Sequence, residues 1–273
     1  MAKVKFLEKL IAMGVLSVVC LATVPAEATV DHTYVSGKGS DTGGCVSPSI
    51  ACRTFGYAIS QTTASGEIIV LDAADYAPVT ITKSISIVAD SGGPAGIVLA
   101  SGNAITINAG SNDVVSLRGL TLEGDGAAAS GIVLNSAGSL TIADCSVRSF
   151  QSSGIVLAPY PTLPIFSKVN ISILNSVMDD NGTGLSITGT GFLETVVAVR
   201  KSVANHNAIG FSVTGATVYF TDSMAIGNTG AGIAIGPING DVSHSLVLSY
   251  GDNEIDGNGT NVSGGTLSSV AKQ

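Results

Sequence analysis

The chain has 273 residues, 34 of them glycine, and a formal net charge of −8. Because its basic residues form no cluster, it is a poor candidate for binding nucleic acid or an anionic membrane surface. No Pro-rich linker or shift in composition divides the chain, so the sequence predicts one domain with a substantial core.

Residues 1–28 have the pattern of a cleavable secretory signal. Three lysines precede the apolar run LIAMGVLSVVCLATV, and small residues flank Glu27. An uncleaved membrane helix is the alternative, but the run is shorter than the ~20 residues that a span needs. Lipoprotein processing at Cys20 is a weaker alternative, because Val19 stands where such sites have a small residue. We therefore expect an exported protein that is periplasmic, cell-surface or extracellular and has no stable membrane insertion. Loss of the signal removes three Lys and two Glu, so the mature part has a formal charge of −9.

Residues 29–76 are predicted to form an N-terminal cap. In an exported protein, Cys45 and Cys52 most simply form a disulfide, whereas a metal site would need more ligands than these two cysteines and the distant His32. The segment RTFGYAISQTTA has apolar residues at helical spacing, with Thr54 placed as the N-cap. A short helix here would cover the open end of a repeat structure.

Residues 77–265 repeat one pattern. Short apolar strands of the type GIVLA begin every 22 to 30 residues, and a second alternating strand, of the type NISILN, lies between them. A third, weaker apolar position follows the second strand, at Leu120, Val147, Val177, Val203, Met224 and Ile255. Three short strands per coil, without helical periodicity between them, predict an all-β parallel β-helix. Residues 266–273 are predicted as a C-terminal tail that caps the last coil only slightly.

Polar residues also recur at fixed points of the coil. Serine follows the second strand at Ser176, Ser202 and Ser223, and asparagine precedes the next coil at Asn181, Asn207, Asn228 and Asn258. We expect these residues to form structural ladders in the turns, since Asn and Ser hydrogen-bond neighbouring backbone groups there. Cys145, in a turn of the same kind, is predicted to be a buried free thiol.

Two regions of the chain, one near each end of the repeats, resemble a known superfamily. The N-terminal TYVSGKGSDTGGC, CRTFGYAIS and SGEIIVLDAADYAPVTITKSISIVAD, and the closing SYGDNEIDGN, resemble pectate-lyase-like right-handed parallel β-helix proteins, including small exported bacterial proteins without an assigned activity. The resemblance implies a right-handed helix with a short N-terminal capping helix. It implies no particular reaction, since one fold supports many functions.

Catalysis on this scaffold would follow one of two chemistries. A glycoside hydrolase would use paired carboxylates, for which the adjacent Asp179 and Asp180 are the candidates. A polysaccharide lyase would need Ca²⁺ on oxygen ligands and a base, which Arg200 or Lys201 could supply, with Asp180 or Asp222 as a ligand. The sequence phrases that carry catalysis in polygalacturonases and pectate lyases are absent, and these residues can equally be part of a solvated face. Asp144, Asn175, Lys201 and Asp222 should form one surface column.

Carbohydrate binding without catalysis is the remaining possibility. Tyr160 lies in the Pro-rich insertion APYPTLPIF, which must project as a loop, and exposed aromatic rings commonly bind sugars. Alternatively, the insertion merely covers the side of the stack. The sequence favours a non-catalytic, exported interaction module directed at glycans, with no cofactor. The alternative is a polysaccharide lyase or a glycoside hydrolase acting on acidic polysaccharides, and Ca²⁺ is expected only for the lyase. The sequence leaves the oligomeric state open, and self-association through the last coil is a third possibility.

Overall fold

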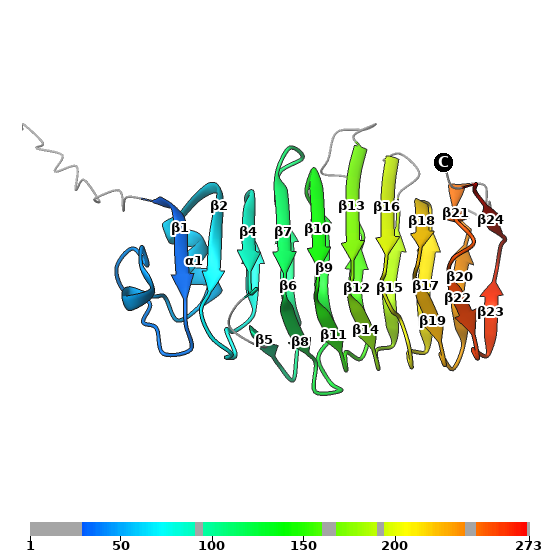
Figure 1. Ribbon diagram of the computed structural model, residues 1–273, viewed down its shortest axis with the longest axis horizontal. Helices are drawn as coiled ribbons and strands as arrows, with labels where there is room; N and C mark the ends of the chain where they lie inside the picture. The colour runs from blue at the N-terminus through cyan, green and yellow to red at the C-terminus, as the bar shows by residue number, and fades with distance from the viewer. Residues whose placement is uncertain (1–28, 91–94, 160–167, 190–193, 238–243, 272–273) are drawn as a thin grey trace, which may run out of the picture.

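The computed structural model describes residues 29–90, 95–159, 168–189, 194–237 and 244–271. They form a parallel β-helix in which the chain passes through three sheets in each turn of the coil, and the coils stack along the long axis of the molecule (Figure 1). All pairings between the strands are parallel. The prediction of an all-β parallel β-helix with three strands per coil is therefore confirmed.

Sheet A is the longest of the three sheets. Its strands, in spatial order, are β1 (Val30–Val35), β2 (Thr62–Val70), β4 (Ile85–Val88), β7 (Val114–Arg118), β10 (Ser139–Ala143), β13 (Lys168–Leu174), β16 (Glu194–Arg200), β18 (Thr217–Thr221), β21 (Leu246–Ser249) and β24 (Leu267–Ser269). The last of these strands lies within the segment predicted as a tail, so sheet A extends into residues 266–273.

Sheet C consists of the first strand type recognised in the sequence. Its strands are β3 (Val79–Ile81), β6 (Asn103–Asn108), β9 (Ser130–Ser136), β12 (Ser153–Leu157), β15 (Thr183–Thr188), β17 (Ile209–Thr214), β20 (Ala231–Gly236) and β23 (Thr260–Ser263). Sheets A and C face each other across the core, as the rings of Phe211 in β17 and Phe220 in β18 show, with centroids 4.8 Å apart.

Sheet B is narrow and joins the other two along one side of the molecule (Figure 1). Its strands are β5 (Ala95–Val98), β8 (Leu120–Glu123), β11 (Ser146–Arg148) and β14 (Val177–Asp179), followed by β19 (Met224–Ile226) and β22 (Glu254–Asp256). Bridges from Val203 to Val177 and to Met224 connect the two groups.

One part of the predicted coil pattern is wrong in sheet B. Val177, Val203 and Met224 are partly exposed on its outer face, and the buried inward positions are Met178, Ala204 and Ala225. A strand of three residues contains too little alternation to fix which residue points inward.

The N-terminal end is capped as predicted. Helix α1 (Phe55–Gln61) begins at Thr54, whose hydroxyl oxygen accepts a hydrogen bond from the Tyr57 N–H, and it buries Phe55, Ala58 and Ile59 against the first coil. A disulfide joins Cys45 and Cys52 on either side of the short 3-10 helix η1 (Pro48–Ile50).

The predicted asparagine ladder is present in the turn from sheet B to sheet C. Asn207 accepts the backbone N–H of Asn181 through Oδ1 (2.9 Å), and its Nδ2 donates to the Met178 carbonyl (2.9 Å) and to Asn228 Oδ1 (3.1 Å). Asn258 continues the row. Every buried amide in this row therefore finds partners in the neighbouring coils.

The predicted serine ladder lies in the turn from sheet A to sheet B. Ser202 Oγ accepts the Ser176 N–H and donates to the Arg200 carbonyl, and Ser223 repeats the arrangement one coil later. Cys145 stands at the first position of this row, where its thiol donates to the Ala143 carbonyl; it is free and buried, as predicted.

Candidate functional site

Arg200 and Lys201 lie at the carboxyl end of β16, where sheet A turns toward sheet B. Both are exposed, and within the described part of the chain neither takes part in an ion pair. Arg118, at the equivalent end of β7, differs from them. Its guanidinium group lies 3.3 Å from Asp90 Oδ2 and 3.9 Å from Asp144 Oδ2. The Arg200–Lys201 pair thus offers two cations without a charged partner.

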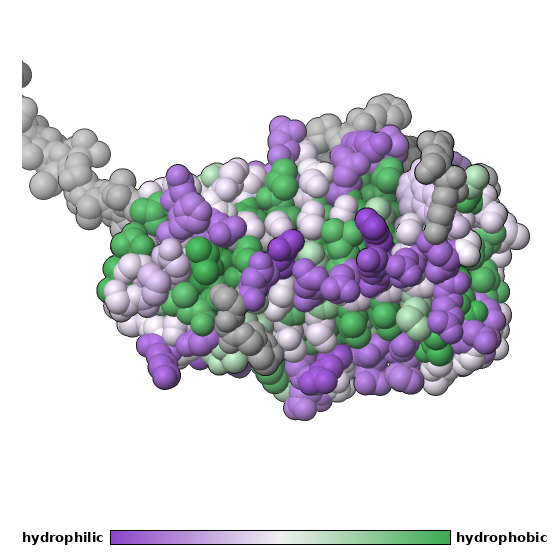
Figure 2. Space-filling view, viewed as in Figure 1, coloured by the Kyte–Doolittle hydropathy of each residue, from purple (hydrophilic) through white to green (hydrophobic). Residues whose placement is uncertain are grey.

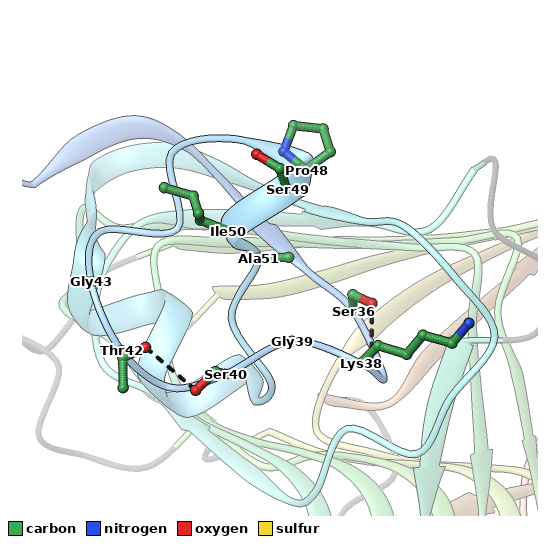
Figure 3. Close-up of a pocket in the computed structure, with 10 residues that line it drawn as sticks. All are labelled: Ser36, Lys38, Gly39, Ser40, Thr42, Gly43, Pro48, Ser49, Ile50 and Ala51. Carbon is green, nitrogen blue, oxygen red and sulfur yellow. Dashed lines mark hydrogen bonds between the residues drawn. The ribbon is translucent and has the colours of Figure 1, made fainter.

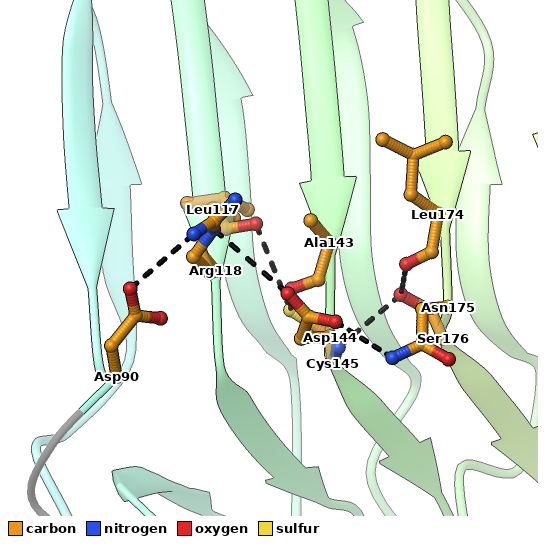
Figure 4. Close-up of polar contacts among 9 residues, drawn as sticks. All are labelled: Asp90, Leu117, Arg118, Ala143, Asp144, Cys145, Leu174, Asn175 and Ser176. Atoms are coloured by element: carbon orange, nitrogen blue, oxygen red, sulfur yellow. Dashed lines mark hydrogen bonds and ion pairs between the residues drawn. The ribbon is translucent and has the colours of Figure 1, made fainter.

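The predicted surface column is confirmed. Asp144, Asn175, Lys201 and Asp222 occupy the same turn of successive coils, each with φ between 46° and 56°. Asn175 Nδ2 donates to Asp144 Oδ1 (2.7 Å), and Arg118 reaches the same carboxylate from the other side (Figure 4). The result is a hydrophilic band along the long axis, at the level where the strands of sheet A end (Figure 2).

Lys201 is the unusual member of this column. A positive φ suits Gly, Asn and Asp, whereas a long side chain is strained there, by about 1 kcal/mol or more. The residue has a φ of 50°. Since strained side chains concentrate at functional sites, the conformation marks this position as a candidate contact.

Two tyrosines that the sequence analysis did not single out lie beside this pair. Tyr219 points outward from the middle of β18, between the buried Val218 and Phe220. Tyr250 follows β21, and its N–H donates to the Phe220 carbonyl. Strand alternation in TVYFT was the signal that could have identified Tyr219 as outward-facing.

Arg200, Lys201, Tyr219 and Tyr250 together form what we call the sheet A patch. Thr221 pairs with Arg200 in register, and Tyr250 lies one strand further along the same end of the sheet. At a strand spacing of ~4.8 Å, Arg200 and Tyr250 lie about 10 Å apart. The patch can donate charge-assisted hydrogen bonds and offers two partly exposed aromatic rings.

Asp179 and Asp180 lie on the other side of sheet B. Asp179 ends β14, and its Oδ1 accepts the Asn205 N–H (3.2 Å), while Asp180 is exposed in the turn toward sheet C with a φ of 58°. Burial raises the pKa of Asp179, with a further contribution from Asp180, and the Asn205 N–H opposes the rise. A carboxyl group that holds its proton more readily has the character of a general acid.

The structure does not bring this acidic pair to the two cations. Asp180 is equivalent to His206 in the next coil, and His206 is five residues after Lys201, across the width of sheet B. Five residues of extended chain span up to ~16 Å, and here they cross sheet B from one turn to the next. Lys201 and Asp222 thus lie in the turn after sheet A and Asp180 in the turn before sheet C, so the candidate base and the candidate ligands are divided between two turns.

Lyase chemistry would need a cation site. The described residues contain no group of three or more His, Cys, Asp or Glu side chains arranged to hold a metal ion. Asp222 lies in the column beside Lys201, and the positive charge of Lys201 would repel a cation bound there.

The cap contains a pocket of about 590 Å³ in the loop after β1 (Figure 3). Its walls carry the hydroxyl groups of Ser36, Ser40 and Thr42. The Lys38 side chain points away from Ser40 and Thr42, and the Ser36 hydroxyl donates to Asp72, so the polar groups do not converge on one point (Figure 3).

Two sequence predictions fall outside the described residues: the signal segment 1–28 and Tyr160. In the described part of the chain, no helix is long and apolar enough to cross a membrane.

Comparison with known proteins defines the class of fold. No protein-family model matches the sequence, and no curated protein matches it. The chain has a pectate-lyase-like right-handed β-helix fold. It is similar to the crystal structure of pectate lyase Pel9A, with a TM-score of 0.54 and 14% identity, over 89% of this chain and 78% of that one. At this identity the likeness is one of fold.

Proposed function

We propose that the protein is an exported, non-catalytic module that binds a carboxylate-bearing polysaccharide through the sheet A patch. The observation that carries the proposal is that Arg200 and Lys201, two cations without an ion pair among the described residues, lie beside the partly exposed rings of Tyr219 and Tyr250 on a parallel sheet. A guanidinium group pairs with a carboxylate through two hydrogen bonds.

The aromatic part of the patch suits the apolar face of a sugar ring. The coils repeat at ~4.8 Å along the axis, so a chain lying along sheet A meets outward side chains at regular intervals. The fold of a pectate lyase supports polysaccharide as the class of ligand. The net charge of the molecule opposes a polyanion at long range, but this repulsion is screened beyond ~8 Å at physiological salt.

Export is part of the same proposal. The apolar, lysine-preceded segment at residues 1–28 and the Cys45–Cys52 disulfide both support it, since disulfides persist mainly in oxidising compartments. Analysis of the mature N-terminus and cell fractionation would test this point directly.

Binding is tested with mature protein on polyuronides and neutral glucans, by affinity electrophoresis and calorimetry. We expect binding to polyuronides, with a loss of about tenfold or more in Arg200→Ala and in Tyr219→Ala, since charge-assisted hydrogen bonds contribute about 1.5–3 kcal/mol. Arg118→Ala and Tyr34→Ala are matched controls, because Arg118 is already ion-paired and Tyr34 lies on the same face of sheet A in β1. Equal losses in the controls, or no binding to any glycan, would reject the patch.

Lys201→Asn separates a binding role from a structural one. Asn tolerates the positive φ of this turn better than Lys does, so we expect the variant to unfold at a slightly higher denaturant concentration while binding more weakly. Unchanged binding would remove Lys201 from the patch.

A glycoside hydrolase centred on Asp179 is the second candidate, favoured by the raised pKa of that carboxyl group beside Asp180. It is tested in the same incubations by measuring new reducing ends. Unsaturated ends are measured in parallel, with Ca²⁺ and with chelator. Products that disappear in Asp179→Asn would replace our main proposal with catalysis at sheet B.

A further inference from the structure

Three strand edges of the last described coil have no strand partner among the residues that the structure describes. β24, β23 and β22 stand at the ends of sheets A, C and B, and each pairs there with another strand on one side. An open strand edge presents free N–H and C=O groups that another strand can bind.

The core is also open at this end. Ile255, Val262 and Leu267 pack against the core but stay partly exposed, whereas Ala225, Ile233 and Val247, one coil earlier, are 0%, 1% and 0% exposed. Within the described ranges no helix covers the last coil, in contrast to α1 at the other end (Figure 1).

We propose that two copies of this chain join end to end through their C-terminal coils, about a two-fold axis. The N-terminal and C-terminal ends of the β-helix differ, and this difference indicates which surface of the second copy is contacted. α1 and the disulfide-closed loop occupy the N-terminal end, so the C-terminal coil is the end at which a second copy can add its own open strands. Contact between identical surfaces forms a closed dimer and cannot extend into a filament.

The charges of the last coil select one of the two possible axes. An axis through sheet B would place Glu254 and Asp256 of β22 against the same residues of the second copy. An axis perpendicular to sheet A instead sets β24 on β24 and β23 on β23, and both of these strands are free of charged side chains. We therefore assign the second axis, which keeps the two acidic edges on opposite sides of the dimer.

This arrangement continues the structure of the single chain. The paired edges run antiparallel across the interface, and the inward side chains of the two last coils close one continuous core. Both copies then present sheet A on the same face, so that their sheet A patches are separated by about seven strand spacings at most, or ~34 Å. The dimer itself does not depend on the proposed function.

The oligomeric state is measured by light scattering after size exclusion, over a hundredfold range of concentration. We expect the mass of two chains for the unchanged protein and of one chain for Leu267→Asp, which would place a carboxylate in the shared core. Val114→Asp is the matched control, since Val114 is an exposed apolar residue (55%) on sheet A far from the last coil. It should remain dimeric.

A cross-link tests the axis without disturbing the core. Ser268 is the middle residue of β24 and faces outward, so Ser268→Cys should form a disulfide between two copies upon mild oxidation, whereas Asp256→Cys should not. A monomer at every concentration would overturn the dimer. Cross-linking at Asp256 in place of Ser268 would overturn the assigned axis.

Discussion

Asn207 lies in the interior of the asparagine ladder, at 1% exposure, and its amide joins three coils. Asn207→Ala would leave the Asn181 N–H and the Met178 carbonyl without this partner in a water-poor turn. We expect the free energy of unfolding to fall by about 2–4 kcal/mol, since each buried polar group left unpaired costs about 1–3 kcal/mol. Urea unfolding followed by circular dichroism measures the change.

Asn258 provides the control for this ladder argument. It occupies the same position in the last coil, where it is partly exposed and water can replace lost hydrogen bonds. Asn258→Ala should therefore cost clearly less than Asn207→Ala. Equal losses at both positions would mean that side-chain packing, and not the hydrogen-bond ladder, stabilises the turn.

Asp179 gives a prediction with a defined dependence on pH. Because burial raises its pKa in the folded state above the ordinary value of 3.8, folding favours the protonated form, and stability is lost as pH rises through the folded-state pKa. Asp179→Asn keeps an acceptor for the Asn205 N–H but cannot ionise. We expect the variant to gain stability relative to the unchanged protein as pH rises above 3.8, and to gain none well below that value.

The measurement is the difference in free energy of unfolding between the two proteins from acid to neutral pH. Asp222→Asn, at an exposed turn position on the other side of sheet B, is the control. A difference that shrinks as pH rises would mean that the folded state stabilises the Asp179 carboxylate, and would remove its claim to act as an acid.

At the scale of elements, the cap depends on a short covalent loop. Cys45 and Cys52 are separated by seven positions, and for a loop of this length the chain-entropy argument gives about 2–3 kcal/mol. We expect Cys45→Ser combined with Cys52→Ser to lower the thermal midpoint, and α1 to exchange its amide protons sooner than the central coils. Reductant should lower the thermal midpoint of the unchanged protein in the same way and leave that of the double variant unchanged. Uniform loss of protection along the whole solenoid would contradict a local role.

The strands and ladders were predictable from sequence because each repeats and each has one buried face. Alternation fixed the inward residues of sheets A and C, and recurrence of Asn and Ser revealed the turns. The same reasoning gave the wrong inward residues in sheet B, since Val177, Val203 and Met224 are apolar but outward-facing. In a three-residue strand, register is set by the turns on either side, and those turns depend on contacts between coils.

The candidate site was less predictable, for a geometric reason. Spacing along the chain placed Lys201 in one column with Asp144 and Asp222, which the structure confirms. Spacing could not show that Asp180 belongs to the opposite side of sheet B, because the alternation of apolar and polar residues does not reveal where the chain changes direction. Strand alternation in TVYFT indicates that Tyr219 faces outward, whereas the length of the Pro-rich insertion favours Tyr160, which lies outside the described residues.

At the scale of the whole molecule, contacts join each coil mainly to its neighbours, so the solenoid is divisible in units of one coil. Val196 pairs with Thr217, and the ladder step from Asn207 to Asn228 is 21 residues. Deletion of residues 196–216 would therefore join Thr195 to Thr217 and set Asn228 beneath Asn181. We expect a folded, cooperatively unfolding protein with the same strand signature by circular dichroism.

A deletion that is not a whole coil is the control. Removing residues 196–210, an odd number, places Phe211 at the outward position where Val196 pairs with Asn170, so that inward and outward side chains exchange faces in sheet A and both ladders break. This variant should be unfolded or aggregated. If the one-coil deletion also failed to fold, the coils would have to be coupled over longer distances than neighbour contacts allow. If the one-coil deletion folds, it also tests the sheet A patch, because it lacks Arg200 and Lys201. We expect this variant to retain the scaffold and to lose polyuronide binding.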